Sequence, residues 1–190
     1  MTVRESKRRA SHGAWIWIGA LVCLAGEVQP AAPPVGLPEA AAAALQRSIE
    51  AARPHETHVW RDTPPLNTDG TVNAYIEITR GERRKFELNI ATNSRVVDRV
   101  MPRELGGYPI NYGLVPQTVS YDGDPFDVLV LGPAIRGGTV VRGVIVGVMH
   151  MDDEKGLDSK VIVSRVDGRG RPHHVLGDGD RRRLTAFFDA

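Results

Sequence analysis

The sequence predicts a mainly β domain with flanking helices, of the α+β class, built on a small β-barrel of the OB kind. Short runs rich in β-branched residues recur from residue 72 to residue 166, and glycines interrupt the longest of them. The 20 glycines and 13 prolines among 190 residues favour strands and loops over a helix bundle. Short strands with glycine bends are typical of small closed barrels.

Residues 1–26 have the pattern of a secretory signal peptide. Basic residues precede the apolar run Ala14–Gly26, which is shorter than the roughly 20 residues that span a bilayer. We therefore expect export to the periplasm and no stable membrane anchor. The alternative is a cytoplasmic protein whose start has been assigned too far upstream.

Residues 27–58 are predicted to form a Pro/Ala-rich linker followed by a helix. Glu39–Arg53 is rich in alanine and is helix-prone, and Pro54 ends it. Its apolar stripe is thin, so we interpret it as a surface helix or spacer. The barrel domain is expected over residues 59–190.

The first strands of this domain are predicted at Val72–Ile78 and Lys85–Leu88. The turn signal Arg80-Gly81 separates them, so the pair is expected to form a hairpin. Gly143 and Gly147 are expected to mark bends or bulges in a later strand. The remaining predicted elements are strands at Val128–Leu131, Thr139–Met149 and Lys160–Val166, and a helix at Arg181–Phe188 capped by Asp178 or Asp180.

Composition excludes several classes of function. The net charge of +1 gives no general attraction to nucleic acid, and a single cysteine excludes a disulfide framework or a cysteine-based zinc site. No histidine-rich spacing recurs, so the six histidines are expected at surface or loop positions: His12, His55, His58, His150, His173 and His174.

The acidic cluster Asp122–Asp127 is the most informative segment. Three carboxylates within six residues repel one another unless a cation neutralises them. Carboxylate oxygens suit hard ions such as Mg²⁺, Mn²⁺ or Ca²⁺. A solvated acidic turn is the alternative for this cluster taken alone.

A second acidic cluster, Asp152–Lys160, also adjoins an apolar strand. The two clusters are expected to meet at one rim of the barrel. Bound metals with Lys85, Arg99 and Lys160 nearby would point to phosphoryl chemistry. Tyr108–Gly113 is read as a turn whose tyrosines either plug the core or donate hydroxyl hydrogen bonds to a phosphate.

Five segments of the chain, which occur in the same order as in that family, resemble the soluble, family I, Mg²⁺-dependent inorganic pyrophosphatases. The most specific is Asp122-Gly-Asp-Pro-Phe-Asp127, which resembles that family's D-x-D-P-x-D signature. The others are Ile76–Ile78 with Lys85–Glu87, Val97–Arg99, Tyr108–Gly113 and Met151–Lys160. The resemblance covers about Val72 to Phe188 and implies an OB-like five-stranded β-barrel.

The resemblance also implies Mg²⁺, with Mn²⁺ as a substitute, and hydrolysis of pyrophosphate to two phosphates by metal-activated water. Asp124 would take the proton from the attacking water. The metal ligands would be Asp122, Asp127, Asp153 and Asp158; the phosphate-binding residues would be Lys85, Arg99, Tyr112 and Lys160; and Glu77, Glu87, Tyr108 and Glu154 would line the site behind them.

One departure from the family pattern lies after Phe187-Phe188, where a tyrosine and a lysine that reach the phosphates would follow. Here only Asp189-Ala190 follows. The chain thus resembles a family member with a shortened C-terminus. The alternatives are an impaired relic that binds metal or phosphate without turnover, and an exported metal-binding module. Members are often homo-oligomers, and we expect the same if the shortened end permits it.

Overall fold

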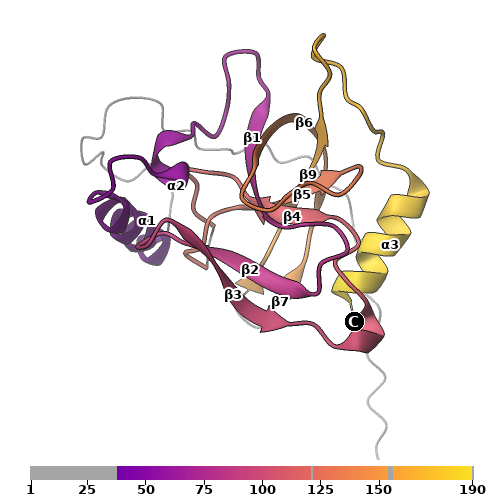
Figure 1. Cartoon of the computed structure of the whole chain (residues 1–190), viewed down its shortest axis with the longest axis horizontal. Helices are drawn as coiled ribbons and strands as arrows, with labels where there is room; N and C mark the ends of the chain where they lie inside the picture. The colour runs from indigo at the N-terminus through magenta and orange to yellow at the C-terminus, as the bar shows by residue number, and fades with distance from the viewer. Residues whose placement is uncertain (1–37, 121, 154–155, 190) are drawn as a thin grey trace, which may run out of the picture.

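The computed structural model describes residues 38–120, 122–153 and 156–189 (Figure 1). The predicted signal peptide and most of the predicted linker lie outside these residues. No helix in the described part of the chain is long and apolar enough to cross a membrane.

The centre of the molecule is a closed five-stranded barrel, which confirms the predicted fold class. Neighbouring strands are antiparallel except for one parallel pair, β5 with β9. Around the barrel the strands follow the order β1 (Val72–Ile78), β4 (Asn111–Leu114), β5 (Asp127–Leu131), β9 (Lys160–Arg165) and β6 (Val140–Met149).

Two small sheets and the helices are attached to this barrel. Figure 1 shows α1 and α3 on opposite sides of it, with the β2–β3 hairpin running between them. The hairpin consists of β2 (Arg84–Asn89) and β3 (Ser94–Val100), and the second small sheet of β7 (Asp152–Asp153) and β8 (Gly156–Leu157). The helices are α1 (Glu39–Ala52), α2 (Val59–Asp62), the 3-10 turn η1 (Arg103–Leu105) and α3 (Asp178–Phe188).

The barrel strands β1, β4, β5 and β9 are buried on both faces along most of their length, which explains the apolar runs of β5 and β9, whereas β6 has exposed residues such as Val140 and Ile145. Val128 and Val130 belong to one hydrophobic cluster, and Leu129 and Leu131 belong to a second cluster that includes Leu184 of α3. This alternation follows the two-residue period of a strand. A third cluster joins Leu45 of α1 and Trp60 of α2 to Leu114 of β4. The helix α1 is therefore packed on the barrel and is not a free spacer.

Two sequence predictions about strands were wrong. Val72–Ile78 and Lys85–Leu88 do not pair as a hairpin, because β1 pairs with β4 and β6, while β2 pairs with β3. The segment Tyr108–Gly113, read as a turn, contains the start of β4. Its Asn111 is buried and donates to the Val130 and Pro133 carbonyls, so a polar residue typical of turns serves inside a sheet.

One of the two predicted glycine bends in β6, at Gly147, is confirmed, and the predicted cap of α3 was wrong. Gly143 lies in regular pairing with both neighbouring strands. The pairing of β6 with β9 shifts register between Ile145 and Gly147, which marks a bulge. Helix α3 begins three residues earlier than expected, with Gly177 as its N-cap residue. Asp180 acts from inside the first turn, where its carboxylate accepts the Gly177 N–H at 3.3 Å.

His58 is also a correction, because it is buried rather than at the surface, with 1% of its area exposed. Its Nδ1 accepts the N–H groups of Trp60 and Arg61 at 3.1 and 3.2 Å, so the ring caps α2. Its Nε2 lies 2.8 Å from the Ile90 carbonyl. Sequence patterns did not show the bond to Ile90 because that residue is 32 positions away and meets His58 only in the folded chain.

Candidate active site

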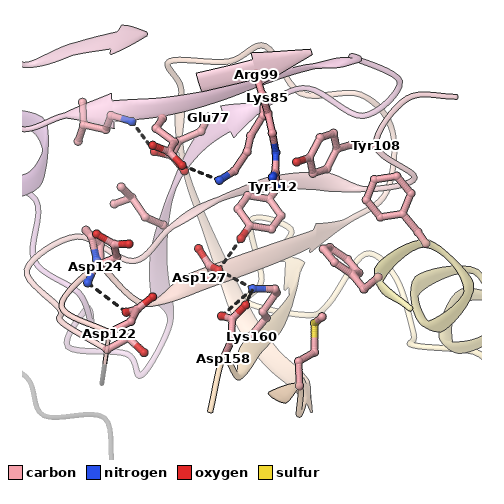
Figure 2. Close-up of a pocket in the computed structure, with 18 of the residues that line it drawn as sticks. Glu77, Lys85, Arg99, Tyr108, Tyr112, Asp122, Asp124, Asp127, Asp158 and Lys160 are labelled. Atoms are coloured by element: carbon pink, nitrogen blue, oxygen red, sulfur yellow. Dashed lines mark hydrogen bonds and ion pairs between the residues drawn. The ribbon is translucent and has the colours of Figure 1, made fainter. Parts of the chain in front are cut away.

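A cavity of about 590 Å³ lies between the β2–β3 hairpin, the barrel strands and α3 (Figure 2). Its wall is polar on the side of the carboxylates and apolar near α3. The charged and hydroxyl-bearing residues that line it are Glu77, Lys85, Glu87, Arg99, Tyr108, Tyr112, Ser120, Asp122, Asp124, Asp127, Asp158 and Lys160.

The barrel side of the cavity is positioned by strand register. The parallel pairing of Val128 with Val161 places the preceding residues, Asp127 and Lys160, side by side. The Lys160 Nζ lies 2.6 Å from Asp127 Oδ2 and 2.8 Å from a carboxylate oxygen of Asp158. Tyr112 of β4 donates its hydroxyl to the same Asp127 oxygen. One buried ammonium therefore holds two carboxylates together.

Burial dominates the electrostatics of this group. Burial raises the pKa of the Asp127 carboxyl, although the ion pair with Lys160 and the Tyr112 hydrogen bond oppose it. The same burial, with the charge of Asp127, raises the pKa of the Tyr112 hydroxyl well above its usual range. Tyr112 is thus a hydrogen-bond donor at neutral pH, as a phosphate contact requires.

Glu77 of β1 is a buried carboxyl with 5% of its area exposed. Its Oε1 accepts the Leu88 N–H at 2.6 Å, which ties β1 to β2. Burial, together with the charges of Asp127 and Glu87, raises the pKa of Glu77 to about 8. An added positive charge in the cavity would favour its ionised form.

The hairpin side of the cavity carries the cations. Lys85 and Arg99 are paired across β2 and β3, and Figure 2 shows both side chains extending toward the carboxylates. Lys85 Nζ lies 2.5 Å from Glu87 Oε1 and 3.3 Å from Asp98 Oδ2. Burial acts to lower the pKa of Lys85. The hydrogen bond to Glu87 and the charge of Asp98 outweigh burial, so the pKa of Lys85 is raised.

The acidic loop, of which the structure describes Ser120 and Asp122–Phe126, closes the third side. Gly123 has a φ of +92°, which favours glycine at this turn. Asp122 Oδ1 accepts the Asp124 N–H at 3.1 Å, and the Ser120 N–H donates to the Asp124 carbonyl at 2.6 Å. Both carboxylates of the loop border the cavity.

Eight of the nine predicted site residues border this cavity: Lys85, Arg99, Tyr112, Asp122, Asp124, Asp127, Asp158 and Lys160. The side chains of Asp153 and Glu154 lie outside the described residues. The expected meeting of the two acidic clusters at one rim holds for Asp122, Asp127 and Asp158. The individual roles given to these residues stay predictions.

Sequence reasoning gave no role to Asp98, although it lies within the Val97–Arg99 motif. Its contact with Lys85 depends on the register shift between β2 and β3, which the sequence did not show. It also missed the aromatic wall: Phe187 lies 5.0 Å from Tyr108, and Phe188 lies 6.3 Å from Tyr112, between ring centroids. These rings exclude water from one side of the cavity.

The donor set suits a hard divalent ion by its chemistry. Asp122, Asp127 and Asp158 offer only oxygen ligands, and all three border one cavity. Burial raises the pKa of Asp127, so a bound cation would favour its ionised form. Among the side chains that the structure describes, no group of three or more potential ligands is already gathered around one point.

The comparisons with known proteins agree with this site. Residues 74–183 match the family model described as inorganic pyrophosphatase. The chain is 42% identical over 106 residues to an inorganic pyrophosphatase of Helicobacter pylori, which covers 55% of this chain and 61% of the relative. The chain thus spans about three-fifths of the length of that curated relative.

Two further comparisons extend over more of the chain. The chain is 39% identical over 138 residues to an inorganic pyrophosphatase of Gluconobacter oxydans, covering 69% of this chain and 79% of the relative. The solved inorganic pyrophosphatase of Coxiella burnetii superposes with a TM-score of 0.61 at 34% identity, covering 66% of this chain and 79% of that one. Since the family match spans most of the barrel and most of the cavity wall, the chain belongs to the inorganic pyrophosphatase family.

Proposed function

We propose that this protein is an Mg²⁺-dependent inorganic pyrophosphatase that hydrolyses pyrophosphate to two phosphates. The observation that carries the proposal is one cavity that Lys85, Arg99 and Lys160 line together with the carboxylates of Asp122, Asp124, Asp127 and Asp158. Pyrophosphate has phosphate groups that need cations, and a hard metal ion needs carboxylate oxygens. The cavity supplies both.

Asp122, Asp127, Asp153 and Asp158 would hold the metal ions, with Mn²⁺ as a substitute for Mg²⁺. Bound divalent ions would supply charge neutralisation for phosphate and would acidify water. Asp124 lies in the acidic loop and borders the cavity, and it would accept the proton of the attacking water. Lys160, which is paired with Asp127 and Asp158 here, would bind a phosphate oxygen when those carboxylates hold the metal ions.

Lys85 and Arg99 would bind the phosphate that leaves. Charge grows on that group as the bond breaks, so cations fixed in advance stabilise the transition state. Arg99 is suited to two phosphate oxygens through its planar guanidinium, and Tyr112 would donate its hydroxyl to a third. Phe187 and Phe188 would keep bulk water from this side of the substrate.

Phosphate release from pyrophosphate by the purified chain tests the proposal. Turnover should need Mg²⁺, stop with a chelator and fall by about a thousandfold in Asp124→Asn, since general-base catalysis contributes factors of this size. Asp178→Asn, an equal change of charge on the exposed start of α3, should keep full activity. A folded, Mg²⁺-binding chain without turnover would refute the proposal and favour the catalytically impaired relic.

Export and self-association are part of the same proposal. Export to the periplasm rests on the pattern of residues 1–26, and fractionation of the source cells with an antibody tests it.

Self-association is supported by Val96, Val97 and Val100, which expose apolar surface along β3. A mass measured by light scattering that equals one chain would contradict a homo-oligomer.

A further inference from the structure

The residues that precede the family match form a structural unit beside the cavity. Residues Glu39–Asp62, called here the N-terminal brace, contain α1 and α2, and the family match begins only at residue 74. Figure 1 shows this unit next to the β2–β3 hairpin. Its contacts reach the acidic loop and the β2–β3 hairpin, which form two walls of the cavity.

The first contact joins α1 to the acidic loop. A Cβ placed on Gly123 would lie 2.9 Å from the Cβ of Ala44, a distance that real Cβ atoms do not adopt. The backbone between Asp122 and Asp124 therefore lies directly against α1. Ala44 is buried there, whereas its neighbour Ala43 is exposed.

The second contact joins α2 to the start of the same loop. Gln117, three residues before Ser120, donates its side-chain N–H to the Arg61 carbonyl. The Arg61 guanidinium in turn donates to the carbonyls of Ala52 at 2.9 Å and His55 at 2.7 Å. Arg61 thus links α2 to the end of α1 and to the segment that leads into the acidic loop.

The third group of contacts reaches the tip of the β2–β3 hairpin. His58 bonds to the Ile90 carbonyl at 2.8 Å. Asn93 accepts the Val59 N–H at 3.1 Å and donates to the Thr57 carbonyl at 3.1 Å. The hairpin that carries Lys85 and Arg99 is anchored at this end by the brace.

The interior of the brace continues into the cavity wall. Leu45 and Trp60 belong to one hydrophobic cluster with Leu88 and Leu114. Leu88 and Leu114 line the cavity themselves. Packing on the brace therefore supports the surface on which the charged side chains are mounted.

We propose that the N-terminal brace is a positioning element of the active site, with Ala44 as the residue that sets the place of the acidic loop. It fixes the separation between the loop that carries Asp122 and Asp124 and the hairpin that carries Lys85 and Arg99. The inference rests on the proposed function for its catalytic consequence. Its consequence for metal binding does not require turnover.

The test is Ala44→Leu, with Ala43→Leu as the matched control on the exposed face of α1. Added volume at Ala44 pushes α1 and the acidic loop apart, which should weaken Mn²⁺ binding about tenfold, as is typical when the support of a metal ligand is altered. Mn²⁺ binding is measured by electron paramagnetic resonance on the full chain. The melting temperature is measured without metal, and the Mg²⁺ concentration for half-maximal phosphate release is measured beside it.

We expect weaker Mn²⁺ binding and a higher Mg²⁺ requirement in Ala44→Leu, no change in Ala43→Leu, and near-normal behaviour of Ala44→Ser. Equal effects of Ala44→Leu and Ala43→Leu, or unchanged Mn²⁺ binding in Ala44→Leu, would overturn the inference. If Ala44→Leu does not fold, Gln117→Ala decides, with a smaller weakening expected and unchanged binding as the contrary result. A wild-type chain that binds Mn²⁺ but releases no phosphate refutes the proposed function alone.

Discussion

The two sides of the cavity hold their charges in different ways. On the barrel side, the Lys160 side chain is 4% exposed and its neighbours are fixed by strand register. On the hairpin side, the Arg99 side chain is 65% exposed and rests on a two-stranded sheet. The barrel therefore positions its residues by its own ladder, whereas the hairpin and the acidic loop depend on contacts with the N-terminal brace.

The largest expected effect on the free energy of unfolding belongs to the barrel. Leu129 of β5 is fully buried, so Leu129→Ala should lose about 3 kcal/mol through lost burial and a cavity. Val97 on the hairpin is 49% exposed, so Val97→Ala should lose less than about 0.5 kcal/mol. Urea unfolding of both variants measures the difference. Comparable losses would show that the hairpin is as integral to the core as the barrel.

Lys160→Met should have the next largest effect. Removal of the ammonium leaves Asp127 and Asp158 facing each other in a partly buried position, which should cost about 2 kcal/mol after allowance for their partial exposure. Added Mg²⁺ should restore part of the loss by neutralising the same carboxylates. Thermal unfolding with and without Mg²⁺ measures this, and a stability equal to that of the wild type without metal would contradict it.

His58 should make the anchoring of the hairpin sensitive to pH. Burial lowers the pKa of His58, and the charges of His55 and Arg61 lower it further. The hydrogen bond to the Ile90 carbonyl acts in the opposite direction but does not outweigh them. The unfolded chain then binds the extra proton more readily, so this contribution to stability is complete above the unfolded pKa of 6.5 and is lost as the pH falls below it. Protonation would also place an N–H on Nδ1, and this group would face the N–H groups of Trp60 and Arg61 that Nδ1 now accepts.

The measurement is the stability of wild type minus that of His58→Asn from pH 8 to pH 5, in the presence of a chelator. The subtraction is needed because the raised pKa of Glu77 contributes with the opposite sign over part of this range. Asparagine keeps an N-cap acceptor but does not titrate. A difference that stays constant with pH would show that His58 does not bind a proton on unfolding in this range.

Sequence reasoning predicted the barrel strands well where β-branched residues form long runs. Val128–Leu131 and Thr139–Met149 were predicted because continuous β-branched runs have few other interpretations. It failed at β4, where Asn111 is buried and its Oδ1 accepts the N–H groups of Arg80 and Ile135. Those partners are distant in sequence, so the residue looked like part of a turn.

The charged residues of the site could be predicted because their spacing resembles a known motif. The contacts that hold these residues in place could not be predicted. The contact of Ala44 with Gly123 joins two residues of no chemical distinction, 79 positions apart. The pairing of Lys85 with Asp98 depends on a bulge in a hairpin whose partner strand was missed. Positioning contacts of this kind depend on tertiary geometry, which a local pattern does not contain.

The most direct contrast with Lys160→Met is Lys85→Met, for which we expect a small change in stability. The two lysines carry the same charge, but the partners of Lys85, Glu87 and Asp98, are 49% and 38% exposed. Water can replace the lost ion pairs, so the free energy of unfolding should fall by less than about 1 kcal/mol.

The effect of Lys85→Met on catalysis should nevertheless be large, because the cation is proposed to meet charge that develops only in the transition state. The rate constant kcat for phosphate release should fall about a hundredfold, with a smaller change in KM. Steady-state kinetics at saturating Mg²⁺ separate the two constants. A variant that loses only affinity, with kcat intact, would show that Lys85 holds the substrate without favouring its transition state. The hairpin would then be a binding surface, and catalysis would belong to the barrel side and the acidic loop.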